Sequence, residues 1–266
     1  MQDETQAGSG PAQEFVRVTS EGAVTRVVLD DPRRMNPQSP RLWARLEAVA
    51  RELPQETRVV VLSGAGESFS AGLDRRFLTP QGLTGLFGPA PSTEQIADRI
   101  AGYQRAFTAW RQVDALVVAA VQGHAIGAGF QLALAADLRV LADDASLCMG
   151  EILVGLVPDL GGTGRLVELV GPDRALEICL TGRRIGAIEA VGLGLASVSV
   201  PSAELEATVD DLVEAILAAD PAALRELLPL LRGATTRDRA AQLAAERGAQ
   251  ARLIARRLDG GAGREA

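Results

Sequence analysis

The stretch Gly64-Ala-Gly-Glu-Ser-Phe-Ser-Ala-Gly-Leu-Asp74 follows a short apolar run, Arg58–Ser63, which is typical of a buried strand. A second stretch, Val121-Gln-Gly-His-Ala-Ile-Gly-Ala-Gly-Phe-Gln-Leu132, follows a similar run at Leu116–Val121. Glycines allow backbone N–H groups to approach a ligand closely. Neither stretch contains G-x-G-x-x-G or G-x-x-x-x-G-K-[ST], so neither is a phosphate loop of those kinds. The repeated order of strand, glycine-rich loop and helix predicts an α/β core.

Periodicity and turn residues predict the remaining elements. Strands are expected over residues 14–19, 23–29, 58–63, 116–121, 137–142 and 197–200. Helices are expected over 40–53, 93–112, 130–136, 161–170, 172–181, 187–193, 203–219, 221–231 and 236–258. The glycines and prolines of 79–91 predict an irregular, mobile segment. The chain should therefore comprise a disordered tail over 1–13, a core over 14–200, a helical region over 201–258 and a frayed end over 259–266.

Length and composition favour one large domain, or a domain with an appendage, for these 266 residues. Hydrophobic residues make up 47% and aromatic residues only 3%, so Ala, Val, Leu and Ile must build the core. No apolar run reaches the roughly 18–20 residues of a membrane span, and the polar, acidic start does not resemble a targeting segment. Cys148 and Cys179 lack the close spacing of a disulfide framework or zinc site, so a reducing cytoplasm is expected.

The charged residues exclude several classes of function. A net charge of -7 disfavours nucleic-acid binding, which needs basic surface. All 27 basic residues are arginine, so neither a lysine Schiff base nor a P-loop lysine can be present. The single histidine, His124, excludes a His-rich metal site, and no metal is expected. We assign His124 a structural role or a place in a pocket wall.

Three segments together resemble the enoyl-CoA hydratase/isomerase (crotonase) family. The first stretch is similar to the family's G-x-G-x-x-F-x-A-G-x-D segment, and Val121–Leu132 is similar to its second signature. Gly150-Glu-Ile-Leu-Val-Gly-Leu-Val-Pro-Asp-Leu-Gly-Gly-Thr163 resembles the third, and Asp31–Asn36 the early P-x-x-x-N segment. Order and spacing agree over about residues 14–260. The resemblance implies a spiral of ββα repeats followed by a helical trimerisation region, in a homotrimer or a dimer of trimers.

The resemblance also implies an acyl-CoA thioester as the substrate, with coenzyme A entering as part of that substrate and no separate cofactor. By motif position, the backbone N–H groups of Leu73 and Ala128 would form an oxyanion hole. Removing a proton beside a thioester places negative charge on the carbonyl oxygen, and losing one fixed donor there typically costs about 3–4 kcal/mol. Further contacts with CoA or substrate are expected at Ala71, Gly72, Asp74 and Gly127. Arg33 and Arg34 either meet the CoA phosphates or are surface charge.

Two signature positions carry the proton chemistry. Hydratases of the family use one glutamate in the second signature and one in the third. The third-signature position is Glu151, but the second is Gln131, which cannot give or take a proton at useful pH. Gln131 could still hold a water molecule. A single glutamate with a raised pKa can remove a proton at one carbon and return it at another, so double-bond isomerisation is expected.

Asp159 lies eight residues after Glu151. Dienoyl-CoA isomerases of the family carry an aspartate there and pair it with the glutamate. Asp159 is therefore either a second acid/base group or the N-cap of the helix that begins near Gly161. Ser70 is not a hydrolase nucleophile, because it lacks the G-x-S-x-G elbow.

Three functions remain open. The chain is expected to shift a double bond in an unsaturated acyl-CoA with Glu151 as acid and base. One alternative is an enoyl-CoA hydratase that tolerates Gln131. The other is a non-catalytic acyl-CoA binding protein.

Overall fold

A computed structural model describes residues 15–262, with side-chain surroundings up to residue 259, so the tail predicted over 1–13 lies outside the described residues. The main sheet has six strands in the order β1-β2-β3-β4-β6-β9. Only the β1–β2 pair is antiparallel, and the other pairs are parallel. The strands are β1 (Val16–Glu21), β2 (Val24–Leu29), β3 (Val59–Gly64), β4 (Leu116–Val121), β6 (Leu138–Ala142) and β9 (Val198–Val200).

Both faces of this sheet are covered, and β3 shows how the sequence achieves it. Successive side chains on a strand point to opposite faces. Val59 and Val61 pack with Val209 of α8 (Leu205–Leu217), whereas Val60 and Leu62 join the larger core on the other side. That larger core includes side chains of α1 (Pro40–Arg51), α3 (Thr93–Thr108) and α4 (Ala128–Ala135). A strand buried on both faces must read as a continuous apolar run.

A second, three-stranded sheet has the order β5-β7-β8. It consists of β5 (His124–Ile126), β7 (Ser146–Cys148) and β8 (Arg184–Gly186). The segment predicted as a glycine-rich loop over 122–129 therefore contains a strand. The residues of β5 (His-Ala-Ile) and β8 (Arg-Ile-Gly) show no alternation of apolar and polar side chains, so neither strand was predicted, whereas the equally short β9 (Val-Ser-Val) was.

The remaining helices follow the predicted pattern with small shifts at their ends. They are α5 (Gly162–Val170), α6 (Pro172–Thr181), α7 (Ala187–Gly192), α9 (Pro221–Arg232) and α10 (Arg239–Ala262). The last helix continues to Ala262, four residues beyond the end predicted at residue 258, so that predicted end is wrong. Five short 3-10 segments complete the structure: η1 (Pro32–Arg34), η2 (Arg75–Leu78), η3 (Ala109–Arg111), η4 (Glu151–Val154) and η5 (Ser202–Glu204).

The irregular segment predicted over 79–91 is wrong for most of its length, because Pro80–Phe87 forms helix α2. Pro80 occupies the first turn, where a missing N–H is tolerated, and the Thr79 hydroxyl accepts a hydrogen bond from Gly82 N at 3.0 Å. Gly82 serves packing: a Cβ there would lie 2.0 Å from the Arg76 carbonyl oxygen of η2. A glycine that weakens a helix locally can thus be required by its neighbour.

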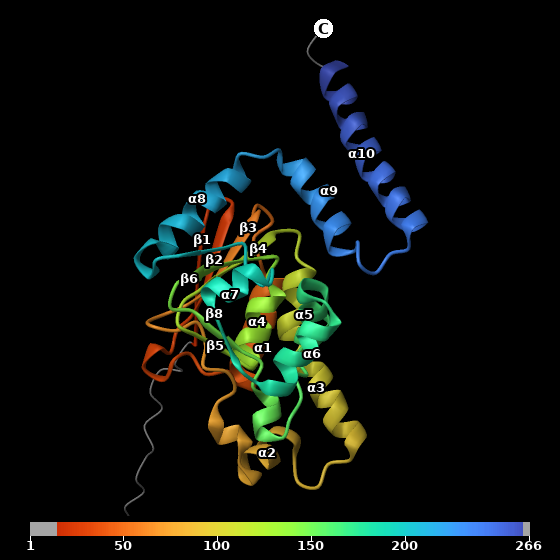
Figure 1. Cartoon of the computed structure of the whole chain (residues 1–266). Helices are drawn as coiled ribbons and strands as arrows, with labels where there is room; N and C mark the ends of the chain where they lie inside the picture. The colour runs from red at the N-terminus through yellow and green to blue at the C-terminus, as the bar shows by residue number, and fades with distance from the viewer. Residues whose placement is uncertain (1–14, 263–266) are drawn as a thin grey trace, which may run out of the picture.

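Helix α8 packs on the main sheet, and the chain then continues away from it through α9 to α10. Helix α10 packs on α9 and lies away from the strands (Figure 1). Arg232, the last residue of α9, anchors this region. Its guanidinium pairs with Asp137 at 2.6 Å and donates to the carbonyls of Val113 and Ala115. No helix within residues 15–262 is long and apolar enough to cross a membrane.

Two glycines of α2 form a matched pair for a stability test. In Gly85→Ala the new Cβ would meet no atom within 4 Å, so the free energy of unfolding should rise by about 0.5–1 kcal/mol, the usual advantage of Ala over Gly in a helix. In Gly82→Ala it should fall by about 1–3 kcal/mol, because the Cβ would overlap the backbone of η2. Urea unfolding measures both. Equal effects of the two changes would contradict this packing of α2 on η2.

Candidate active site

The two glycine-rich segments lie side by side and are joined by hydrogen bonds between their main chains. Ser70 N donates to the His124 carbonyl at 2.8 Å, and Ile126 N donates to the Ser70 carbonyl at 3.1 Å. Gly72 has φ +85°, and a Cβ there would lie 2.4 Å from the Ile126 oxygen and 3.8 Å from the Ala128 nitrogen. Only glycine allows this approach. The two stretches recognised in the sequence are thus brought together.

A buried polar network supports the first loop from behind. Asn36 donates to the carbonyls of Ala65 and Ser68 at 2.9 and 2.8 Å. The Ser70 hydroxyl donates to the Asn36 carbonyl at 2.7 Å and accepts a hydrogen bond from Gln38 Nε2 at 3.1 Å. Trp43 Nε1 in turn donates to Gln38 Oε1 at 2.8 Å. Sequence reasoning missed Gln38 and Trp43, because polar partners that are remote in sequence leave no local pattern.

The amides of Leu73 and Ala128 flank the junction of the two loops. Neither amide N–H donates a hydrogen bond to another group within residues 15–262. Ala128 is the first residue of α4, where the first N–H groups have no partner inside the helix and the helix dipole favours negative charge. The arrangement offers two backbone donors to an anion, and their assignment as an oxyanion hole remains a prediction.

Helix α4 is buried along its length and is bound by a side chain at its C-terminal end. All eight of its residues, including Gln131, are buried. At its C-terminal end the buried Arg139 guanidinium donates to the carbonyls of Ala133 and Ala136 at 3.3 and 2.7 Å. A cation is favourable at this end of a helix, and Arg139 donates to the Ala136 carbonyl and adds a second donor to the Ala133 carbonyl, which also accepts from Ala136 N. Sequence reasoning did not single out Arg139.

Asp74 fixes the end of the first loop. Its buried carboxylate accepts hydrogen bonds from the guanidinium groups of Arg34 at 2.6 Å and Arg76 at 2.8 Å, and from Arg76 N at 3.1 Å. These bonds hold the pKa of Asp74 well below its usual range, with the Arg76 side chain as the largest cause. Asp74 therefore orders the loop and caps η2. Arg34 is engaged by this carboxylate, whereas Arg33 is exposed and forms no ion pair with any described residue.

Glu151 begins η4 and lies beside Gln131. Gln131 Nε2 donates to Glu151 Oε1 at 2.7 Å, while Glu151 Oε2 is buried and has no hydrogen-bond partner within the described chain. Burial raises the pKa of Glu151; the Gln131 hydrogen bond acts against this and the charge of Asp159 adds to it. Gly127 faces the same carboxylate: a Cβ added there would lie 3.2 Å from Oε1. The structure thus brings together Gln131, Glu151 and Gly127.

Asp159 is half-buried, and burial raises the pKa of its carboxyl group. The alternative role as a helix cap is wrong, because α5 has Gly161 at its N-cap and none of its amides bonds to the Asp159 carboxylate. The Asp159 carbonyl accepts a hydrogen bond from Gln104 Nε2 at 2.7 Å, which ties this segment to α3. Gln104 was not recognised in the sequence, where an amide on a helix has no special signature.

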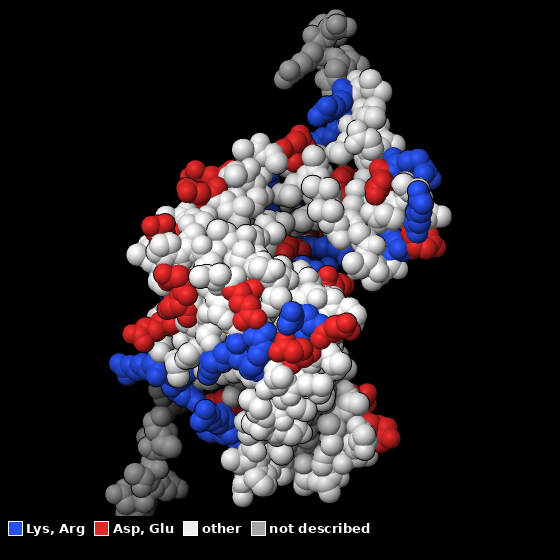
Figure 2. Space-filling model, in the orientation of Figure 1, with Lys and Arg blue, Asp and Glu red and all other residues white. Residues whose placement is uncertain are grey.

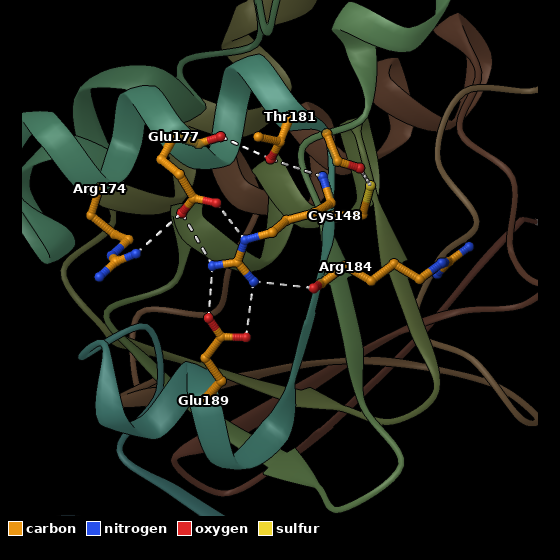
Figure 3. Close-up of polar contacts among 8 residues, drawn as sticks. Cys148, Arg174, Glu177, Thr181, Arg184 and Glu189 are labelled. Carbon is orange, nitrogen blue, oxygen red and sulfur yellow. Dashed lines mark hydrogen bonds and ion pairs between the residues drawn. The ribbon is translucent and has the colours of Figure 1, made fainter.

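The turn between α6 and β8 supports the Glu151 segment. Leu153 of η4 packs against Gly182, where a Cβ would lie 2.8 Å from Leu153 Cγ, and the Cys148 thiol donates to the Gly182 carbonyl at 3.1 Å. Next to this turn, Arg183 binds Glu177 of α6 at 2.5 Å and Glu189 of α7 at 2.7 Å (Figure 3). These ion pairs hold the turn between two helices.

The surface around this segment is unusually apolar. Five side chains of the Glu151 segment are exposed: Ile152, Leu153, Val154, Leu156 and Val157. On the face drawn in Figure 2, basic and acidic side chains form a mixed band, and the area below it is largely uncharged. His124 lies in β5 with Nδ1 3.5 Å from Arg184 Nη1. Within the described residues, no group of three or more His, Cys, Asp or Glu side chains could hold a metal ion.

Comparisons with known proteins identify the relatives of this chain. The family model described as enoyl-CoA hydratase/isomerase matches residues 19–259. The carnitinyl-CoA dehydratase of Escherichia coli K12 is 35% identical over 222 residues, which cover 82% of this chain and 80% of that protein. A candidate enoyl-CoA hydratase from Thermobifida fusca YX, solved in complex with CoA, superposes with a TM-score of 0.85 at 45% identity, covering 92% of this chain and 95% of that one. Its complex with acetoacetyl-CoA gives a TM-score of 0.84 at 44% identity, covering 91% and 95%.

Replacing Asp74 should change stability in a pH-dependent way. Asp74→Asn should lower the free energy of unfolding at pH 7 by about 1–3 kcal/mol, because the charge-assisted bonds to Arg34 and Arg76 are lost. The folded pKa is depressed, so this stabilisation is present above the unfolded value of about 3.9 and disappears as the pH falls below it. Urea unfolding between pH 7 and pH 3 measures the difference, with Asp98→Asn on the exposed face of α3 as the control. A difference that does not change with pH would contradict this role of Asp74.

Proposed function

The chain belongs to the enoyl-CoA hydratase/isomerase family and has the crotonase fold, as its sequence motifs implied, and from this premise we propose that it moves a double bond in an unsaturated acyl-CoA. As a member of this family it is an enzyme acting on an acyl-CoA, with coenzyme A entering as part of the substrate. The observation that carries the finer proposal is the partner of Glu151, which is the amide of Gln131 and not a second carboxylate.

The chemistry requires one group that both takes and gives a proton. In a 3-enoyl-CoA, Glu151 removes a proton from the carbon next to the thioester carbonyl, and the electron pair moves onto the carbonyl oxygen. In this proposal the amides of Leu73 and Ala128, the latter at the start of α4, stabilise the resulting dienolate. The proton then returns to a different carbon, the thioester carbonyl re-forms and the double bond has moved. Burial, which raises the pKa of Glu151, makes it suited to both steps.

Asp159 is the second group in this proposal. Its charge acts on Glu151, and burial raises the pKa of both carboxyl groups. A dienoyl-CoA substrate, in which proton removal and return are separated by more carbons, would use Asp159 for one of the two transfers. The exposed Arg33, beside Arg34 and Asp74 at the first loop, is our candidate contact for the CoA phosphates, together with backbone at Ala71, Gly72 and Gly127.

Hydration of a 2-enoyl-CoA, or the reverse dehydration, is the second candidate function. It is favoured by the names of the relatives, which are a carnitinyl-CoA dehydratase and candidate enoyl-CoA hydratases. In this reaction Glu151 would act on water held near Gln131. The third function considered from the sequence, non-catalytic binding of an acyl-CoA, would leave the buried, unpartnered Glu151 Oε2 without a use.

A substrate panel in heavy water distinguishes these functions. The protein is incubated with 2-enoyl-, 3-enoyl- and 3,5-dienoyl-CoA, and the products are followed by NMR and mass spectrometry. We expect double-bond migration with deuterium incorporation. Dominant hydration of 2-enoyl-CoA would overturn the isomerase proposal in favour of a hydratase. Binding without turnover or exchange would overturn both.

Two variants test the acid/base assignment. Glu151→Gln should lower kcat by at least about a thousandfold with KM changed little, because the group that transfers the proton is removed while the fold is kept. Asp159→Asn should lower kcat for the dienoyl substrate by about ten- to a hundredfold and for the 3-enoyl substrate by less. Retained activity in Glu151→Gln would show that another group is the base.

We also propose that the chain forms a homotrimer or a dimer of trimers through its C-terminal helices. In support, α9 and α10 expose the large apolar side chains Leu227, Leu231, Leu243, Ile254 and Leu258, and α10 lies away from the core (Figure 1). Burying such side chains between subunits is favourable. Sedimentation velocity should show a species of three or six chains, and a monomer at micromolar concentration would overturn this assembly.

A further inference from the structure

We propose that Gln131 is a positioning residue whose single amide group fixes Glu151 and the Asp159 turn relative to each other, and selects Oε2 of Glu151 as the proton-transferring atom. This inference rests on the proposed function for the identity of the reaction. Its geometric part concerns hydrogen bonds within the chain and can be tested without any substrate.

The orientation of the Gln131 amide is set by the start of α5. Its Oε1 accepts hydrogen bonds from Leu160 N at 2.9 Å and Gly162 N at 3.2 Å. Backbone N–H groups can only donate, so the oxygen must face α5 and the NH₂ group must face the other way, toward Glu151. Gln131 is 1% exposed, and a Cβ on Gly162 would lie 2.6 Å from its Cγ. The side chain therefore has no room to turn over.

The two ends of this amide bind the Glu151 side chain and the backbone next to Asp159. Nε2 donates to Glu151 Oε1 at 2.7 Å. Oε1 binds the amide of Leu160, the residue that follows Asp159. Gln131 lies on α4, which is buried throughout. The positions of both acidic segments are therefore fixed relative to this one helix. Gln104 on α3 adds a second tie by donating to the Asp159 carbonyl at 2.7 Å.

The same bond distinguishes the two oxygens of Glu151. Oε1 accepts a hydrogen bond from Gln131, whereas Oε2 is buried and accepts none from any residue between 15 and 262. A carboxylate oxygen without a donor is the more basic of the two, so the proton is transferred through Oε2. Three titratable groups interact electrostatically with Glu151: Asp159, Cys148 and Cys179.

The substitution Gln131→Glu distinguishes the hydrogen bonds that hold the Asp159 turn from the hydrogen bond to Glu151. Gln131→Glu keeps an oxygen that accepts from Leu160 N and Gly162 N, so the turn is still held. It replaces the N–H donor at Glu151 with a second carboxylate, and two adjacent carboxylates share a proton. The pKa of Glu151 should therefore rise. Since the base must be deprotonated, the acidic limb of the kcat/KM profile should move to higher pH.

The experiment compares Gln131→Glu with Gln112→Glu, which adds the same charge at an exposed position on the segment after α3. We expect the acidic limb to move upward by at least about one pH unit, and kcat at pH 6 to fall at least about tenfold with KM within threefold. The control should match the parent protein. An unchanged limb and unchanged kcat in Gln131→Glu would overturn the inference, whereas no turnover by the parent protein would overturn the proposed function alone.

A measurement on the unmodified protein covers the case in which Gln131→Glu fails to fold. The side-chain NH₂ signals of Gln131, observed by ¹⁵N NMR, should titrate with the carboxyl group of Glu151, and this titration should vanish in Glu151→Gln. It requires no substrate and no activity. Signals that do not move with pH, or that move identically in Glu151→Gln, would overturn the inference.

Discussion

The close approach of two main chains, Gly72 against the carbonyl of Ile126, is the contact on which the site depends. It places the free amide of Leu73 beside the free amide at the start of α4. A side chain at position 72 would force these segments apart, because the obstacle is backbone and cannot move aside. The network of Asn36, Ser70 and Gln38 then fixes the first loop at that distance. The proposed acid/base residues Glu151 and Asp159 lie on segments next to this pair of loops.

The proposed proton-transfer group, Glu151, and its partner Gln131 lie next to this junction of the two loops. Glu151 follows β7, which is paired with the β5 strand that leads into α4. Gln131 lies one turn into α4 and touches both Glu151 and the start of α5. Gln131 therefore holds the Glu151 carboxyl group near the start of the same short helix, where the free Ala128 amide lies. A reaction that creates an enolate needs this coincidence, because charge and proton must be handled together.

The sequence predicted the main strands, the two loops and the order of the C-terminal helices, because long apolar runs and clustered glycines are local signals. It also brought Glu151, Gln131 and Asp159 to attention through their motif positions. It could not predict β5 or β8, which show no alternation of apolar and polar residues, nor α2, where Gly82 is needed for packing on η2 and not for a turn. The bond between Gln131 and Glu151 also had to come from the fold. Sequence alone showed that an acid is missing at position 131, and the structure shows what the amide does there.

Helix α4 is buried along its whole length, with Arg139 bound to its last carbonyls and Gly127 held at its start by a hydrogen bond to the Cys148 carbonyl. Its free amide therefore has a fixed direction before any ligand arrives. The conformational entropy of ordering that donor is lost during folding and does not weaken association. In consequence, the freedom lost on complex formation at this end of the site belongs mainly to the ligand, and stiffening the ligand should strengthen its binding more than stiffening the protein.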